Sequence, residues 1–125
     1  MEDMKLHKTA VIHPDAKLSE GVEVGPYSVI GAGVAILENC RIGSHCVIDG
    51  HTTIGKNCQI FTGAIIGSAP QDKKFNENDD VELVIGENNM IREYVTMNPG
   101  TVDGGRKTII GNNNLRKFQQ HIAKV

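Results

Sequence analysis

The side chains with the clearest capacity for chemistry lie in one polar segment, SAPQDKKFNENDDVEL, at residues 68–83. Within it, Gln71, Asp72 and Lys74 provide an amide, a carboxylate and an ammonium group close together. A carboxylate accepts hydrogen bonds from hydroxyl groups, and an ammonium group can meet a phosphate or a carbonyl oxygen. The segment is therefore either a functional loop or an insertion that is simply solvated, and its composition leaves both interpretations open.

The three cysteines are a second candidate for chemistry, as metal ligands or redox groups. Cys40, Cys46 and Cys58 form no CxxC pair, and their odd number argues against a disulfide framework. Each also falls at a position that the repeat described below assigns to small buried side chains. We therefore expect three buried thiols and no metal site.

Composition and charge exclude several other classes of function. The chain has 125 residues, the length of one domain, and its formal net charge is -2, which is too balanced for a nucleic-acid or anionic-membrane partner. The start, MEDMKLHKTA, lacks the apolar run of a signal peptide. No stretch approaches the ~20 apolar residues of a membrane span. We expect a cytoplasmic protein without membrane insertion.

A six-residue repeat organises the first half of the chain. Aliphatic residues recur at Ile12, Leu18, Val24, Ile30, Ile36, Ile42, Ile48, Ile54, Ile60 and Ile66. Two residues before each lies a small or β-branched residue: Ala10, Ala16, Val22, Ser28, Val34, Cys40, Cys46, Thr52, Cys58 and Ala64. Residues two apart share one face of a strand, so each repeat supplies one large and one small inward side chain.

Three such strands per turn build a triangular prism, which is a parallel β-helix and an all-β fold. Residues 18 apart should then stack, with Ile12, Ile30, Ile48 and Ile66 on one face and Leu18, Ile36 and Ile54 on a second. Glycine often follows the large residue, at Gly25, Gly31, Gly43, Gly55, Gly67, Gly86 and Gly111. We expect these glycines to form tight corners with φ > 0.

The repeat is interrupted twice. The polar segment 68–83 is predicted to be a loop expelled from the prism, after which the repeat resumes at Ile85, Ile91 and Met97. A smaller excursion, TVDGGRKT, occupies residues 101–108 before Ile109 and Ile110 return to the prism. Loops on a rigid scaffold often carry function, which makes both excursions candidate site segments.

Several sequence motifs indicate which protein family the chain resembles. GHTTIG (50–55), IGSAPQDKKF (66–75), IGENNMIREYVTMNPGTVDGG (85–105), IGNNNL (110–115) and HIA (121–123) follow one another in this order. Together they resemble the UDP-N-acetylglucosamine acyltransferases, whose hexapeptide repeats form a left-handed β-helix. That hand is an exception to the usual right-handed crossover, and only the resemblance supports it.

The resemblance implies the first step of lipid A synthesis. A 3-hydroxyacyl chain passes from acyl carrier protein to the 3-hydroxyl of UDP-N-acetylglucosamine, while a general base removes the hydroxyl proton and a donor stabilises the developing oxyanion. It also implies a homotrimer with active sites between neighbouring prisms. No metal or other cofactor is implied.

Five residues match substrate-binding positions of the family. Gln71, Asp72 and Lys74 fit its Gln-Asp-x-Lys pattern, in which the Asp and the Lys contact the sugar nucleotide or the acyl group. Asn98 stands where some members have His, and His121 matches a His that lines the sugar site. Without the resemblance, His121 would be interpreted as a solvated side chain.

The general base is where this sequence departs from the family. Members continue as His-Ile-Ala-His-Asp, and the second His is the base, whereas this chain has Lys124 at that position. An ordinary lysine has a pKa of ~10.4, so its protonated amine cannot accept a proton unless it is desolvated. We therefore expect this chain to be impaired or inactive as an enzyme.

The repeat also weakens just before Lys124. Counting six from Ile110 puts Arg116 at an aliphatic position, where a buried charge would be costly. We expect a β-helix domain at 1–115, a degenerate segment at 116–125 that leaves it, and no C-terminal helical domain of the family. Two alternatives remain: a non-catalytic β-helix module for trimerisation or binding, and another sugar acyltransferase of the hexapeptide-repeat group.

Overall fold

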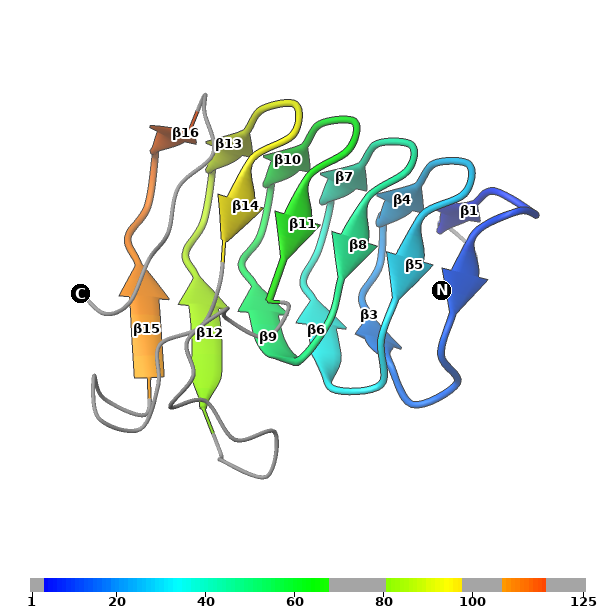
Figure 1. Ribbon diagram of the computed structural model, residues 1–125, viewed down its shortest axis with the longest axis horizontal. Helices are drawn as coiled ribbons and strands as arrows, with labels where there is room; N and C mark the ends of the chain where they lie inside the picture. The colour runs from blue at the N-terminus through cyan, green and yellow to red at the C-terminus, as the bar shows by residue number, and fades with distance from the viewer. Residues whose placement is uncertain (1–3, 68–80, 98–106, 117–125) are drawn as a thin grey trace.

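The computed structural model describes residues 4–67, 81–97 and 107–116, and within these ranges the chain is all β without a helix (Figure 1). The strands form three parallel sheets. Sheet A contains β1 (Lys5–Leu6), β4 (Glu23–Val24), β7 (Arg41–Ile42), β10 (Gln59–Ile60), β13 (Met90–Ile91) and β16 (Leu115–Arg116). Sheet B contains β2 (Val11–Ile12), β5 (Val29–Ile30), β8 (Val47–Ile48), β11 (Ile65–Ile66) and β14 (Thr96–Met97). Sheet C contains β3 (Lys17–Leu18), β6 (Val34–Ile36), β9 (His51–Ile54), β12 (Glu82–Ile85) and β15 (Lys107–Ile110).

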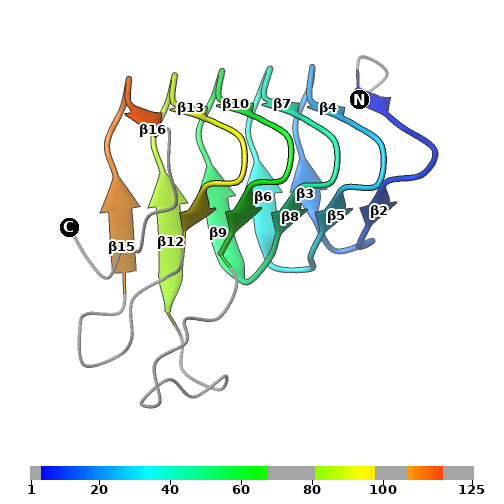
Figure 2. The same ribbon diagram turned by 45° about the horizontal axis from the view of Figure 1, so that its top comes forward.

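The chain visits sheets A, B and C in turn, so that each coil adds one strand to every sheet (Figure 2). The parallel β-helix predicted from the six-residue repeat is therefore confirmed. Its stacking is confirmed as well, because Ile12, Ile30, Ile48 and Ile66 are successive register partners in sheet B. Leu18, Ile36 and Ile54 are register partners in sheet C.

The core is the column of large residues together with the column of small ones. Ile36, Ile48, Ile54 and Ile66 have no exposed surface, and the small inward positions from Val22 to Ala64 are buried beside them. Where a small position is polar, it is hydrogen-bonded: the Ser28 hydroxyl donates to the Gly43 carbonyl at 2.6 Å. A buried hydroxyl with a partner avoids the penalty of an unsatisfied polar group, so Ser28 fits an otherwise apolar column.

The glycines that follow the large residues do not have the backbone conformation predicted for them. Of the seven, only Gly67 has a positive φ, at 83°. At most of the others the next coil is too close for a Cβ, and Gly111 is an exception because a Cβ there would meet nothing within 4 Å. A Cβ on Gly55 would lie 2.7 Å from the carbonyl carbon of Gly86, and one on Gly25 would lie 2.9 Å from that of Gly43. Close backbone contact, rather than a left-handed turn, therefore explains most of the repeated glycines.

Left-handed conformations occur instead three residues after the large side chain. At the corner between sheets C and A, these positions hold residues that adopt φ > 0 easily: Gly21, Asn39, Asn57, Asn88 and Asn113. At the corner between sheets A and B, they hold Tyr27, His45, Gly63 and Tyr94. The repeat therefore has a second signature, which is an αL residue at these two corners of the coil.

Three predicted boundaries shift, and one is the end of the second excursion, because β15 begins at Lys107 and Thr108 is already buried before the expected end at residue 108. Val81 and Leu83 are buried and β12 begins at Glu82, so the prism resumes before residue 83, the expected end of the first loop. Leu83 lies two residues before Ile85 and fills the small inward position, which explains the earlier return. At the other end, the backbone of Arg116 still pairs with Ile91, so the ladder reaches residue 116. Residues 117–125 lie outside the described ranges.

The close backbone contact at Gly55 leads to a prediction about the stability of the fold. Gly55→Ala should lower the free energy of unfolding by more than about 1 kcal/mol, because the new methyl group would press on the Gly86 backbone although φ is ordinary. Gly111→Ala is the matched control, since a Cβ there meets nothing within 4 Å. It should change stability by no more than about 0.5 kcal/mol. Urea denaturation of both variants is the measurement, and equal losses would contradict the contact explanation.

Candidate functional site

The two excursions from the prism leave and return at the same corner. Residues 68–80 connect β11 of sheet B to β12 of sheet C, and residues 98–106 connect β14 of sheet B to β15 of sheet C. Because β11 pairs with β14 and β12 pairs with β15, the ends of the two excursions are anchored side by side on adjacent coils (Figures 1 and 2). The prediction that both segments depart from a rigid scaffold is confirmed for their flanking residues.

The predicted site residues themselves lie outside the described ranges. Gln71, Asp72 and Lys74 belong to residues 68–80, and Asn98 belongs to residues 98–106. His121 and Lys124 fall in residues 117–125. The structure therefore brings together the anchors of the first four residues, while their substrate-binding roles and the base position remain predictions.

The start of the first excursion is tightly held. The Gly67 N–H donates to the Met97 carbonyl at 2.7 Å, and the Thr52 hydroxyl donates to the Asp49 carbonyl at 2.7 Å. Gly67 is buried at φ 83°, and a Cβ on it would collide with the Asp49 carbonyl oxygen and the Thr52 hydroxyl. Only glycine satisfies both the conformation and the space at this position. The backbone at Gly67, the last described residue before the first excursion, is therefore fixed in place.

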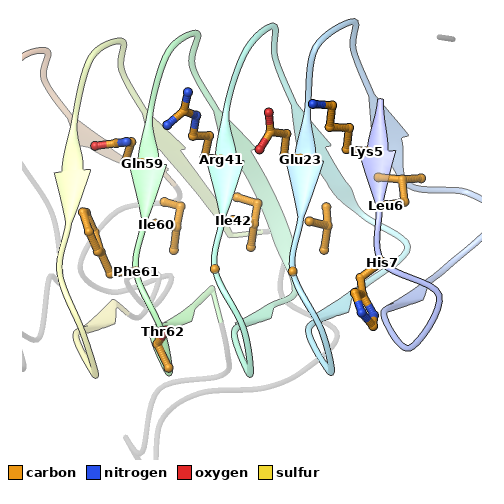
Figure 3. A pocket seen from close by; sticks show the side chains of 13 residues that line it. Lys5, Leu6, His7, Glu23, Arg41, Ile42, Gln59, Ile60, Phe61 and Thr62 are labelled. Atoms are coloured by element: carbon orange, nitrogen blue, oxygen red, sulfur yellow. The ribbon is translucent and has the colours of Figure 1, made fainter. Parts of the chain in front are cut away.

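A separate groove of about 470 Å³ lies over sheet A (Figure 3). In Figure 3 the outward residues of successive strands form one row, and the residues at the strand ends form another. The first row is Lys5, Glu23, Arg41 and Gln59, and the second includes His7 and Phe61. The Arg92 guanidinium lies 4.3 Å from the centre of the Phe61 ring, a cation–π contact at the edge of the groove.

The groove was not predicted, because outward rows become visible only once the prism shows which side chains point away from the core. Its floor includes Gly25 and Gly43, whose missing side chains leave the hollow. In the sequence, the residues that line the groove are those immediately before and after each large inward residue of sheet A. This groove lies on sheet A, whereas the two excursions leave from the opposite corner, so the two features are separate candidate surfaces.

The cysteines are buried free thiols, as predicted. Burial raises the pKa of Cys46, and a hydrogen bond with Cys58 together with burial raises the pKa of Cys40. Their sulfurs meet backbone carbonyl oxygens, for example that of Gly55 at 3.0 Å from Cys40 Sγ. These thiols are therefore core side chains that contact the backbone of adjacent coils.

A bound metal ion needs clustered ligands and a helical membrane span needs a long apolar helix, and the described part of the chain for both is residues 4–67, 81–97 and 107–116. Among those residues, no group of three or more His, Cys, Asp or Glu side chains is arranged to hold a metal ion. The same ranges contain no helix that is long and apolar enough to cross a membrane.

Comparison with known proteins gives consistent matches. The family model of the GMPPB C-terminal domain matches residues 6–112. The acyl-acyl-carrier-protein UDP-N-acetylglucosamine O-acyltransferase of Sulfurimonas denitrificans is 57% identical over 95% of this chain and 45% of its own length. The enzyme of the same name from Sulfurovum sp. is 53% identical over 94% of this chain and 45% of its own length. The chain thus spans less than half the length of these relatives.

Solved structures agree with these matches. A crystal structure of UDP-N-acetylglucosamine acyltransferase superposes with a TM-score of 0.91 at 44% identity, covering 96% of this chain and 46% of that one. A coil of the opposite hand could not superpose so closely, so the left-handed coil implied by the sequence motifs is confirmed. The names of these relatives also agree with the resemblance seen in the motifs.

Gly67 provides a test of how the first excursion is anchored. Gly67→Ala should lower the free energy of unfolding by roughly 2 kcal/mol or more, because it forces an alanine into a left-handed conformation and into contact with Asp49 and Thr52. Gly31 occupies the equivalent corner of an earlier coil, where the added Cβ would meet only the Asp49 side chain, which can move. Gly31→Ala should therefore cost clearly less. Thermal and urea unfolding of the two variants would contradict this explanation if Gly31→Ala were the more harmful.

Proposed function

Because this chain belongs to the family of the GMPPB C-terminal domain and matches the amino-terminal part of UDP-N-acetylglucosamine acyltransferases, we propose that it serves their reaction. In that reaction, a 3-hydroxyacyl chain moves from acyl carrier protein to the 3-hydroxyl of UDP-N-acetylglucosamine, the first step of lipid A biosynthesis. The chain's role is to supply the rigid prism and the two excursions that bind the sugar nucleotide. The family's homotrimeric assembly and a cytoplasmic location belong to the same proposal.

One observation carries this proposal. Identity of about half the residues extends over 94–95% of this chain in the relatives named as acyltransferases, and it includes the segments that leave the prism. The geometry supports it, because those segments are anchored on adjacent coils at one corner. Substrate-binding side chains from two separate segments can therefore reach one ligand.

The residues of the excursions have distinct proposed roles. The Asp72 carboxylate accepts hydrogen bonds from sugar hydroxyls, and the Lys74 ammonium group binds a phosphate or the acyl carbonyl oxygen. Gln71, Asn98 and His121 complete the sugar-binding set. None of these roles needs a cofactor, because the thioester of acyl carrier protein already supplies an activated acyl group.

The proton that must leave the attacking hydroxyl has no evident acceptor at the expected position. Lys124 occupies the place of the family's basic histidine, and a solvated lysine is protonated at neutral pH. The proposal therefore separates two steps: this chain binds the sugar nucleotide, and it does not itself remove the proton. Binding without transfer would favour the alternative function, a non-catalytic β-helix module.

Binding of the sugar nucleotide is the first test. UDP-N-acetylglucosamine should bind the 125-residue chain in isothermal titration calorimetry, and Asp72→Ala should weaken that binding about 10-fold or more by removing a charged acceptor. Asp15→Ala is the matched control, because Asp15 is an exposed aspartate at the same corner of the first coil. Absence of binding, or equal weakening by both variants, would reject the proposed sugar-nucleotide site.

Acyl transfer is the second test. With radiolabelled 3-hydroxyacyl carrier protein and UDP-N-acetylglucosamine, the chain should form no detectable product, since loss of a general base costs a factor of ~10²–10⁴. Lys124→His alone should not restore transfer, because a base must also be held within hydrogen-bonding distance of the hydroxyl. Product formation by the unmodified chain that Asp72→Ala abolishes would show that the excursions suffice and that the identity of residue 124 matters little.

A further inference from the structure

The groove over sheet A has a wall of polar side chains. Successive strands contribute Lys5, Glu23, Arg41 and Gln59, one from each coil, and these four residues are register partners in a single row (Figure 3). The row therefore alternates two cations with a carboxylate and ends on an amide. At the equivalent outward positions, the first four strands of sheet B have only valine and isoleucine.

The head groups of this row are not used within the described part of the protein. Opposite charges on adjacent strands can stabilise a sheet by pairing. Among residues 4–67, 81–97 and 107–116, however, none of the four side chains makes an ion pair or a hydrogen bond. Glu23 and Gln59 are half-buried in the wall of the groove. Their carboxylate and amide therefore remain available to a ligand.

The floor of the groove lacks side chains at two central positions, Gly25 and Gly43. The N–H of Gly25 donates to the Ile42 carbonyl at 2.8 Å, and the N–H of Gly43 donates to the Ile60 carbonyl at 2.7 Å. Because both N–H groups belong to the ladder, they cannot pair with an added peptide strand or bind a phosphate. A ligand must therefore be recognised by the side chains of the wall and by contact with the floor.

An aromatic ring stands at one end of the two floor glycines. Phe61 follows Ile60 as Gly43 follows Ile42, and these strands are register partners, so the ring lies one coil beyond Gly43. Arg92 belongs to the next coil, and its guanidinium lies 4.3 Å from the ring centre without lining the groove. The ring is thus held by a contact outside the groove while it lines the groove itself. An apolar ring in this position can pack against the C–H face of a sugar.

The alternation of charge indicates the class of ligand. An anion attracted by Lys5 and Arg41 would meet the Glu23 carboxylate between them, and a cation attracted by Glu23 would have a positive charge on either side. A neutral ligand with many hydroxyl groups avoids both penalties, because each hydroxyl can donate as well as accept. Its hydroxyls would accept from the two cations and donate to the carboxylate in charge-assisted hydrogen bonds. A sugar combines such hydroxyl edges with apolar C–H faces.

We propose that the groove over sheet A is a binding site for a neutral oligosaccharide. Its volume of about 470 Å³ falls within the ~300–1,000 Å³ that is usual for ligand pockets. The wall spans four coils, a length of about 14 Å, which is the reach of several linked sugar rings and not of one. The two excursions leave the prism between sheets B and C, so this inference does not depend on the proposed function.

Isothermal titration calorimetry of the 125-residue chain tests the proposal with three neutral tetrasaccharides: maltotetraose, cellotetraose and N-acetylchitotetraose. At least one of them should bind with a Kd of about 1 mM or lower. Tetragalacturonate is the matched anionic probe and should bind more weakly, because its carboxylates meet Glu23. Absence of binding by all three neutral probes overturns the proposal, and so does tighter binding of tetragalacturonate.

Variants of the wall test the contacts with the tetrasaccharide that binds. Glu23→Ala should raise its Kd about 10-fold or more, whereas Glu23→Gln should raise it clearly less because the amide oxygen still accepts from a hydroxyl. Glu38→Ala is the matched control, since Glu38 is half-buried like Glu23 but lies outside the groove. Phe61→Leu is an independent variant and should raise the Kd about 3-fold or more by removing the ring. Equal effects of Glu23→Ala and Glu38→Ala would reject the site.

Residue-resolved NMR locates the bound sugar. The tetrasaccharide should shift the amide resonances of Gly25 and Gly43 and leave that of Gly67 unchanged, and the reverse pattern overturns the proposal. An excess of UDP-N-acetylglucosamine should change the tetrasaccharide Kd less than about 2-fold, because the two surfaces are separate. Displacement would reveal one shared site and overturn this inference. If UDP-N-acetylglucosamine does not bind while the tetrasaccharide does, the proposed function fails and the groove site stands.

Discussion

The close stacking of coils is the interaction on which the rest of this structure depends. Each coil donates its backbone N–H groups to the next, as in the bonds from Gly55 to Ile85 and from Gly43 to Ile60, both 2.7 Å long. At that spacing the corners of successive coils are in contact, so a Cβ has no room at several of them. The same spacing aligns every inward side chain with its equivalent one coil away, and the core becomes a set of columns.

The stacking of the coils also determines how a polar side chain can be accommodated in the core. Asn89 lies at a small inward position and is almost completely buried, yet its amide donates to the carbonyls of Gly86 and Gly111 and its oxygen accepts from the Asn114 N–H. All of these partners belong to corners of adjacent coils. A buried amide with its partners satisfied links two coils instead of destabilising them. The spacing of the coils thus lets the buried Asn89 form hydrogen bonds that connect two of them.

Much of the fold could be predicted from the sequence because the inward columns leave a direct record in it. The stacking of Ile12 through Ile66 follows from counting by six. The conformation of the glycines could not be predicted, because both a left-handed φ and a close neighbour require glycine, and only the positions of the coils separate the two causes. The end of the first excursion was placed too late because Glu82 is polar although Leu83 already fills an inward position.

The candidate site was predictable to a smaller extent, and the reason is also physical. Outward residues are free of the packing constraint, so periodicity says nothing about Lys5, Arg41 or Tyr27. The residues of the excursions were recognised through motifs and not through the repeat. In a repeat protein each coil is stabilised mainly by its neighbours, which lets outward rows and loops vary without unfolding the prism. A side chain on an outward row or in a loop can therefore change without leaving a signal in the inward columns of the repeat.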